Sequence, residues 1–361
     1  MATSIENDMT FGANHYVPIL KVKQGEKAAL SRVADALVPR ITPLLEIVER
    51  TGGKGIDKHI ETAFKGLRDA VSSYPRCFID TREIETDGSA AAHAVFSRAK
   101  AAGMVFTPVT GVTRTVDVGP ALEHRDHGIG LRLTRAEFEA GQLPSAIPAF
   151  LGTHELSLSD VDLIVDLGTV AEMIVDGIAA LTNAFLADVP NHQDWRTFTV
   201  SASAFPVSMG GVDRHSHDLV ERSDWLSWRD HLHSARHSLV RLPTYSDYAI
   251  QHPLGVEGFD FRFMQVSAAI RYTTSEHWLL VKGESTRSVA PSSQFPALAT
   301  RLVYGHLKQH FAGSDHCVGC QSMKAAADGA SGYGSAGAWR RLGTIHHLSA
   351  VMQGLQNLNW P

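Results

Sequence analysis

The stretch YVPILKVKQGEKAALSRVADALVPRITPLLEIVE, residues 16–49, contains the unit from which the fold follows. Its first eight residues, YVPILKVK, predict a buried strand, and Gly25 follows as a turn. Residues 26–41 carry apolar side chains at helical spacing, and ITPLLEIVE, residues 41–49, indicates a second strand. The stretch therefore predicts a strand–helix–strand unit, which brings two parallel strands into one sheet.

The same unit recurs along the first 250 residues or so, at a spacing of about 25–40 residues. Eight such repeats over about 250 residues are what a (β/α)₈ barrel requires. A doubly wound open sheet is the alternative, but the GxGxxG match at Gly332–Gly337 lies in a glycine-rich loop that follows no predicted strand, and GxxxxGK[ST] is absent. We therefore predict an α/β protein with a TIM-like (β/α)₈ barrel. The expected strands lie around Ile19, Leu45, Ile79, Phe106, Leu131, Ile164, Val200 and Val240.

The last third of the chain departs from this repeat. SAAIRYTT, residues 267–274, and HWLLVKG, residues 277–283, predict an antiparallel hairpin joined at Ser275–Glu276. Helical segments follow, and they are expected to complete the barrel rather than to fold alone. The predicted organisation is a flexible N-terminus over 1–14 and a single domain over 15–361, with the barrel at about 15–255 and the hairpin and helical extension at about 256–361.

Composition limits the class of partner. The chain has 361 residues, 44% of them hydrophobic, and a formal net charge of −5. We therefore expect no generic nucleic-acid binding and no attraction to acidic membranes. Three cysteines cannot form a disulfide framework, and neither a secretory signal nor an apolar run of about 20 residues is visible. These features predict a cytoplasmic protein without membrane contact.

Charged residues of both signs follow the predicted strands, and in a barrel the functional site collects at the C-terminal ends of the strands. Taken singly, each is better explained as a solvated rim charge or an ion pair between strands. Together they favour an anionic ligand with a hydroxyl or phosphate group. The set is Lys21, Lys23, Glu46, Glu49, Asp80, Arg82, Glu83, Arg132, Asp166, Arg241 and Asp247, with Ser201 and Ser203 after the seventh strand.

Glu46 and Asp80 lie on neighbouring predicted strands. They are candidates for general acid–base chemistry or for a divalent metal, and the alternative is an ion pair of each with Lys21 or Arg82. No GxSxG motif is present, which excludes the nucleophile of an α/β-hydrolase. Asp247 follows the eighth predicted strand, either as a turn cap or as a contact over the barrel mouth.

The motif HCVGC, residues 316–320, resembles half of a zinc site, and His346 and His347 follow later in the chain. Adjacent histidines on a helix point about 100° apart and rarely bind one ion together. One of them, with His316 or His310, could still complete a site. We favour two partly buried thiols near a helix start, so no metal ligand is assigned and the cofactor is left open. One histidine of the pair is expected to face the barrel and bond to an Asp or Glu at the mouth, and the other is expected to face solvent.

Five segments, taken in order, resemble the beta protein family, which is named after a T-even phage protein and occurs in bacteria and prophages. The resemblance covers about residues 15–355. It implies a link to mobile elements or to phage–host conflict, and it carries over no established catalytic residues. The segments are YVPILKVKQGEKAAL, TPLLEIV, SDYAIQHP, SAAIRYTTSEHWLLVKG and WRRLGTIHHL. The matching positions are Tyr16, Pro18, Lys21, Lys23, Glu26, Glu46, Asp247, Tyr248, Arg271, Tyr272, Lys282, Gly283, Trp339, Arg340, Gly343, His346 and His347.

The resemblance also bears on HCVGC. The family pattern has Ser-x-Gly-Asp where this chain has Cys317 to Cys320. It implies that Gly319 is the positional requirement, that the thiols are replaceable, and that residue 320 caps the helix that follows.

Two hypotheses of function follow. The first is an enzyme acting on a phosphate-bearing, nucleotide-like or otherwise anionic small molecule. The second is a non-catalytic interaction protein with a partner from a defence operon. Convergence of the strand-end charges in one pocket favours the enzyme, whereas charges paired off around a filled mouth favour the scaffold. The candidate catalytic residues are Glu46, Asp80, Asp247, His346 and His347. The candidate ligand-binding residues are Lys21, Lys23, Arg82, Arg132, Tyr248, Arg271, Lys282, Trp339 and Arg340.

Overall fold

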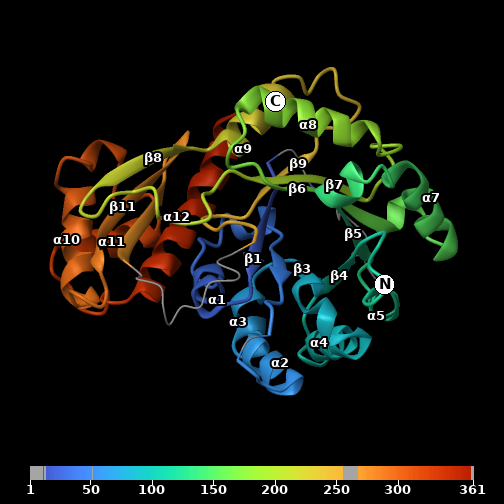
Figure 1. Ribbon diagram of the computed structural model, residues 1–361, viewed down its shortest axis with the longest axis horizontal. Helices are drawn as coiled ribbons and strands as arrows, with labels where there is room; N and C mark the ends of the chain where they lie inside the picture. Colours follow the sequence, from blue (N-terminus) through green and yellow to red (C-terminus); the bar gives the residue numbers. More distant parts are fainter. Residues whose placement is uncertain (1–10, 12–13, 51, 255–266, 359–361) are drawn as a thin grey trace, which may run out of the picture.

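Eight parallel strands close into a barrel surrounded by helices (Figure 1), which confirms the predicted α/β barrel. The computed structural model describes residues 11, 14–50, 52–254 and 267–358, so the expected flexible N-terminus lies almost wholly outside the described residues. The barrel strands are β1 (Tyr16–Lys21), β2 (Leu44–Glu46), β3 (Cys77–Asp80), β4 (Phe106–Thr110), β5 (Ile129–Thr134), β6 (Val161–Thr169), β7 (Thr197–Ser203) and β9 (Thr244–Asp247).

Side chains inside the barrel form three layers, because successive residues of a strand point alternately inward and outward. The middle layer is an apolar cluster that includes Val17, Phe78 and Ile164. Polar side chains fill both ends. The register places Lys21 beside Glu46 and Glu46 beside Asp80, so that charges from three strands share one level at the C-terminal end.

Helices wrap the outside of the barrel, and each buries one face against the strands. In the helix that spans residues 89–101, for example, Ala92, Val95, Phe96 and Ala99 are buried, and their positions i, i+3, i+4 and i+7 lie on one face of the helix. The α-helices of this ring are α1 (Gln24–Leu30), α2 (Ile56–Phe64), α3 (Leu67–Val71), α4 (Ser89–Ala101), α5 (Val118–Glu123), α6 (Arg135–Glu139), α7 (Leu143–Thr153), α8 (Val175–Ala187) and α9 (Ser223–Ser227). Shorter turns are η1 (Val38–Arg40), η2 (Arg82–Asp87), η3 (Leu158–Asp160) and η5 (Lys308–His310), with a π-helical turn, η4 (Trp228–His233).

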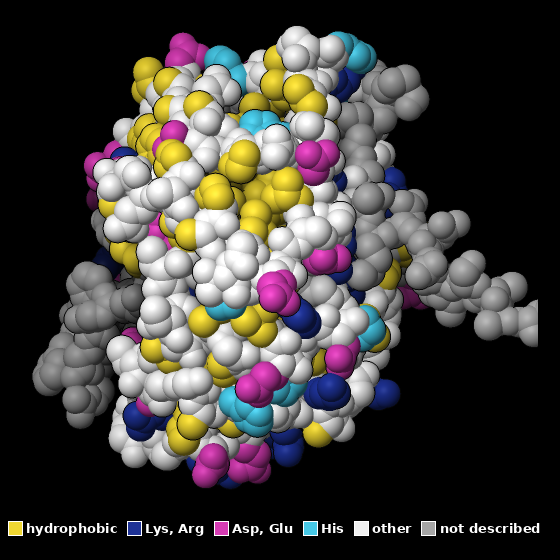
Figure 2. Space-filling view, turned by 90° about the vertical axis from the view of Figure 1, so that its right-hand side faces the viewer, with side chains coloured by type: hydrophobic (Ala, Val, Ile, Leu, Met, Phe, Trp, Pro, Cys, Tyr) yellow, Lys and Arg dark blue, Asp and Glu magenta, His cyan; other side chains and the backbone are white. Residues whose placement is uncertain are grey.

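The outer surface of the helical ring carries scattered charges of both signs. Figure 2 views the molecule from the side that carries α7, with apolar side chains gathered in its upper part and many of the charged and histidine side chains lower down. None of the helices in the described part of the chain is both long enough and apolar enough to cross a membrane.

The sequence predicts the eighth strand around Val240, and this prediction is wrong. Val240 is 75% exposed in the preceding loop, and the strand is Thr244–Asp247. It pairs with Tyr16–Pro18 of β1 on one side and with Thr199–Ser201 of β7 on the other. The position of the strand is therefore set by its pairing with β1 and β7, which closes the barrel, and not by the local apolar run around Val240.

The C-terminal third forms a second layer beside the barrel (Figure 1). Strands β10 (Ser267–Thr273) and β11 (His277–Ser285) pair as the predicted hairpin. An unpredicted strand, β8 (His217–Glu221), extends their sheet; its mostly exposed side chains give no apolar alternation from which to predict it. The sheet and its helices enclose a separate apolar cluster that includes Phe295, Met323 and Trp339. The helices are α10 (Pro291–Val303), α11 (Val318–Ala327) and α12 (Ala336–Asn357), and α12 lies between the sheet and the barrel, in contact with β10, β1 and α1.

Candidate active site at the barrel mouth

Arg132 organises the C-terminal mouth of the barrel from strand β5. Its buried guanidinium donates from Nη1 to Glu46 Oε1 at 2.8 Å and to Asp80 Oδ2 at 2.7 Å. It also contacts Asp166 Oδ2, from Nη2 at 2.7 Å and from Nε at 3.0 Å. The hydroxyl of Tyr248 accepts from Arg132 at 2.5 Å and donates to Asp166 at 2.7 Å. Three strand-end carboxylates thus share one cation, so the predicted pairing of Glu46 and Asp80 with Lys21 or Arg82 is replaced by pairing with Arg132.

Arg114 is a second buried guanidinium at the mouth, and the search of strand ends missed it. Its Nη2 contacts Asp80 Oδ1 at 2.8 Å and also Asp117. A Cβ added at Gly111 would lie 2.9 Å from Arg114 Cδ and 3.1 Å from the carbonyl oxygen of Arg132, so glycine is required for this approach. Arg114 lies in the loop that follows β4, four residues after its end. A search extended from strand ends into the following loops would have found it.

Three polar atoms of this group are buried without a hydrogen-bond partner among the described residues. They are Oε2 of Glu46 and the Nε and Nη1 atoms of Arg114. Both side chains line a cavity of about 460 Å³ at the mouth, together with Arg82, Asp166 and Tyr248. Buried polar groups are nearly always bonded, so unpartnered atoms beside a cavity indicate where a ligand or water completes the network.

The charges at this level do not balance. Carboxylates outnumber cationic side chains by five to four: the carboxylates are Glu46, Asp80, Glu83, Asp117 and Asp166, and the cations are Lys21, Arg82, Arg114 and Arg132. Burial raises the pKa of Glu46, and the negative charges of Glu83 and Asp80 act in the same direction. Burial also opposes the ionisation of Asp80, but Arg114 and Arg132 outweigh it and hold the pKa of Asp80 well below its usual range. Of these two carboxyls, Glu46 is therefore the one that takes up a proton more readily.

A basic group lies beside this acidic side of the mouth. Its members are Lys21, Lys23, Arg271 and Arg340. Reduced solvation lowers the pKa of Lys23, and the positive charges of Lys21 and Arg340 lower it further. Burial lowers the pKa of Arg271 to about 10, with a contribution from Arg340. In the part of the chain that the structure describes, neither Lys23 nor Arg340 forms an ion pair with a carboxylate. The group also contains negative charge, because Lys21 pairs with Glu83 and the carboxylate of Glu26 acts on Lys23 and Arg271. Lys23 and Arg340, which form no ion pair among the described residues, are suited to an anionic ligand.

Asp247 and His347 lie outside the barrel wall rather than in the mouth. Asp247 Oδ2 accepts from His347 Nε2 at 3.0 Å and from the Tyr245 hydroxyl at 3.0 Å, while Oδ1 accepts from the Tyr16 hydroxyl. His347 Nδ1 bonds to Thr273 Oγ1 at 2.9 Å, which ties α12 to β10. His347 bonds to a carboxylate as predicted, but that carboxylate, Asp247, lies outside the mouth where the bond was expected. Burial lowers the pKa of His347, and the fully buried pair connects the barrel to the extension.

The remaining candidates are also apart from the mouth. His346 is buried and not exposed to solvent, contrary to the prediction for one histidine of the pair. Lys282 donates to the carbonyl oxygens of Met209 and Val212 at 2.8 and 2.6 Å. Trp339 is buried in the apolar cluster of the extension and donates to the carbonyl of Tyr333 at 2.7 Å. Of the fourteen predicted site residues, the mouth and its basic side bring together Glu46, Asp80, Lys21, Lys23, Arg82, Arg132, Tyr248, Arg271 and Arg340.

The HCVGC motif begins α11. Cys317 is the N-cap, and its Sγ accepts from the backbone nitrogen of Cys320 at 3.4 Å, so the expected cap at residue 320 is wrong. Gly319 is a position of close approach, because an added Cβ would lie 2.7 Å from the carbonyl oxygen of Leu342 in α12. The glycine is therefore required where two helices meet, as the resemblance implied.

The fold and this polar, cavity-bearing mouth define a (β/α)₈ barrel of the kind that binds ligands at the C-terminal ends of its strands. The sequence profile of the family described as Beta protein matches residues 16–353, nearly the entire chain. The chain belongs to the Beta protein family. A comparison with curated proteins found no match.

Proposed function

We propose that this protein is an enzyme that binds a small anionic, phosphate-bearing or nucleotide-like molecule in the barrel mouth, with Glu46 as the general acid–base group. The observation that carries the proposal is the set of unpartnered buried atoms on Glu46 and Arg114, whose side chains line the same cavity. They offer a hydrogen-bond acceptor or acid beside two donors, which is the arrangement for holding a ligand and exchanging a proton with it.

The role of Glu46 follows from its surroundings. Oε1 is held by Arg132, which fixes the direction of Oε2, and burial raises the pKa of the carboxyl. A carboxyl with a raised pKa can donate a proton and take it back near neutral pH. Asp80, with its depressed pKa, remains ionised and holds both guanidiniums in place.

The anionic group of the ligand is assigned to the two arginines that line the cavity. Arg114 has two free donors, and the Arg82 side chain is 40% exposed there. Arginine is well suited to this role, because its planar fork matches the oxygens of phosphate or carboxylate. A cavity of about 460 Å³ is within the usual size range of small-molecule sites.

The test is a thermal-shift screen with inorganic phosphate, nucleoside monophosphates and sugar phosphates, followed by mass spectrometry of each compound that binds. The wild type is expected to bind and convert at least one compound. Glu46→Gln is expected to bind it without conversion, and Arg114→Met to lose binding. Arg68→Ala serves as control, since that side chain is 61% exposed on α3. The proposal fails if no compound shifts the melting temperature, or if Arg114→Met binds as tightly as the wild type.

The second candidate is a non-catalytic component of an antiphage defence system. It is favoured by the extensive pairing of Arg132 with Asp80 and Asp166, which resembles a structural plug more than an open catalytic centre. Phage plating on a bacterial host that expresses the chain tests it. If protection is seen and Glu46→Gln and Arg114→Met protect as well as the wild type, the barrel acts as a scaffold.

A further inference from the structure

The HCVGC motif and α12 place two thiols and two imidazoles in one cluster, far from the barrel mouth. The ligand atoms of His316, Cys317 and His346 all lie within 4.8 Å of one another. The Sγ atom of Cys320 is 3.2 Å from His346 Nδ1, and the Sγ atom of Cys317 is 3.9 Å from the same nitrogen. We propose that His316, Cys317, Cys320 and His346 bind a zinc ion that fastens the start of α11 to α12.

The spacing of these atoms suits a tetrahedral ion. Zinc lies about 2.0–2.1 Å from imidazole nitrogen and about 2.3 Å from thiolate sulfur, so its ligands are separated by about 3.3–3.8 Å. The two sulfur–nitrogen distances bracket this range. The ligand atoms of His316, Cys317 and His346, all within 4.8 Å of one another, reach this range with shifts of about 1 Å. Cys320, which lies outside that group, must also move closer to the others. Two thiolates and two imidazoles are donors that zinc prefers, in contrast to the oxygen ligands of magnesium or calcium.

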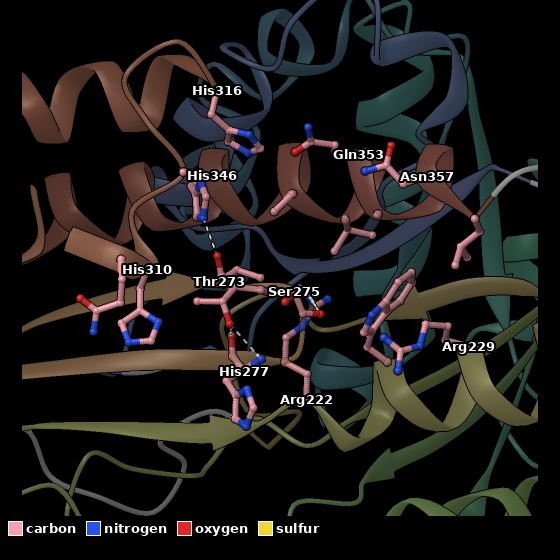
Figure 3. A pocket seen from close by; sticks show the side chains of 18 residues that line it. Arg222, Arg229, Thr273, Ser275, His277, His310, His316, His346, Gln353 and Asn357 are labelled. Carbon is pink, nitrogen blue, oxygen red and sulfur yellow. Dashed lines mark hydrogen bonds between the residues drawn. The ribbon is translucent and has the colours of Figure 1, made fainter. Parts of the chain in front are cut away.

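The orientation of His346 is already that of a ligand. Its Nε2 atom lies 2.7 Å from the backbone carbonyl of Thr273, so Nε2 carries the proton and donates it (Figure 3). The lone pair on Nδ1 is then directed at the two thiols. A metal-binding histidine usually has its second ring nitrogen bonded in this way, because the bond fixes both the tautomer and the ring.

The other three proposed ligands are either held by hydrogen bonds to their sulfur atoms or have a ring nitrogen without a partner. His316 lies near His346 at the edge of the pocket in Figure 3, and its buried Nε2 has no hydrogen-bond partner among the described residues. The Tyr272 hydroxyl accepts from the backbone nitrogen of Ala312 at 2.8 Å, which leaves its proton for the sulfur of Cys320 at 3.4 Å. The backbone nitrogen of Cys320 donates to Cys317. These bonds stabilise the charge of thiolates.

The sequence alone disfavoured zinc because His346 and His347 are adjacent and cannot both reach one ion. The structure separates their roles: His347 contacts Asp247 on the barrel side, and His346 faces the thiols. The fourth ligand is His316, the first residue of the motif.

Metal content of the full chain, purified under reducing conditions without chelator, tests the site. Elemental analysis is expected to give about one zinc per chain. His316→Gln, Cys320→Ser and His346→Gln are expected to lose most of it. His310→Gln should keep it, since His310 lines the same pocket in Figure 3 and lies outside the cluster.

Cobalt(II) added to the metal-free wild type gives a readout that does not depend on the folding of variants. Tetrahedral coordination with two thiolates is expected to give strong visible absorption and a sulfur-to-cobalt band, which Cys317→Ser roughly halves. The proposal is overturned if the wild type takes up neither metal, if all variants retain zinc equally, or if the reduced preparation holds a Cys317–Cys320 disulfide instead.

Discussion

Arginine–carboxylate clusters occupy both ends of the barrel, but the clusters differ in how many of their buried polar atoms have hydrogen-bond partners. At the N-terminal end, Asp162 accepts hydrogen bonds from Arg76, Arg196 and Thr197, at 2.5 to 3.2 Å. Arg76 also bonds to Thr107 and lies 5.0 Å from the ring centre of Phe11. Among the described residues, no buried polar atom of Arg76, Asp162 or Arg196 lacks a partner. At the C-terminal end, Glu46 and Arg114 retain unpartnered atoms beside a cavity.

This difference separates a cluster that only holds the barrel strands together from one that has hydrogen-bonding atoms left for a ligand. A saturated ion cluster holds strands together and has nothing left to offer a ligand. An unsaturated one costs stability, because buried donors and acceptors without partners forfeit their hydration. Unpartnered atoms on Glu46 and Arg114, and none on Arg76, Asp162 or Arg196 among the described residues, support the proposal that the mouth binds another molecule.

The largest expected effect is at the saturated end. Asp162→Ala leaves the guanidiniums of Arg76 and Arg196 buried without their carboxylate, and it is expected to lower the free energy of unfolding by about 3–5 kcal/mol. Urea denaturation measures the loss. Asp69→Ala, at a side chain that is 82% exposed, should change it by less than about 0.5 kcal/mol. A loss below about 1 kcal/mol for Asp162→Ala would remove the contrast between the two ends.

Arg114→Met should affect binding more than stability. We expect a loss of about 1–3 kcal/mol in the free energy of unfolding, since Asp80 keeps Arg132 and Asp117 keeps two threonine hydroxyls. The affinity for the phosphate-bearing ligand should fall at least about tenfold, measured by calorimetry. An unchanged affinity would show that the unpartnered nitrogens are not a binding feature.

Gly111→Ala tests the packing that positions Arg114. The added methyl group lies within contact distance of Arg114 Cδ and the carbonyl of Arg132, so a loss of about 1–3 kcal/mol is expected, with weaker ligand binding. Gly119→Ala is the matched control. Gly119 lies in α5 with open space around its Cα, and alanine there should stabilise by up to about 1 kcal/mol. Equal changes in the free energy of unfolding at both positions would contradict the close approach of Arg114 to Gly111.

Glu46→Gln should have the smallest effect, and its sign depends on pH. Because the folded-state pKa of Glu46 is raised, its contribution to stability is present below the unfolded pKa and is lost as pH rises through the folded pKa. The neutral variant should therefore gain stability relative to wild type as the pH rises above about 4.3, the ordinary pKa of glutamate. Thermal melts over that range measure it. Asp80→Asn should show the opposite trend, since the pKa of Asp80 is depressed. A parallel pH dependence of Glu46→Gln and wild type would contradict a raised pKa.

Much of the site's location was predictable, but its connections were not. The charges after β1, β2, β3 and β5 could be assigned to one mouth because parallel strands end at the same edge. The partners could not: Glu46 meets Arg132 across 86 residues of sequence, on a strand that is not its neighbour. Asp247 shows the converse. It ends a strand as Glu46 does, but it points outward, because strand register decides which face a residue occupies.

The sequence by itself determined the repeated strand–helix unit, the hairpin, and the acidic and basic residues available at the strand ends, since these depend on local periodicity and turn residues. Tertiary structure alone decided the eighth strand, the convergence of Arg114 and Glu46 on one cavity, and the meeting of His316 with His346. Each of these depends on contacts between segments far apart in the chain. Such contacts arise from barrel closure and helix packing, which no local pattern of side chains encodes.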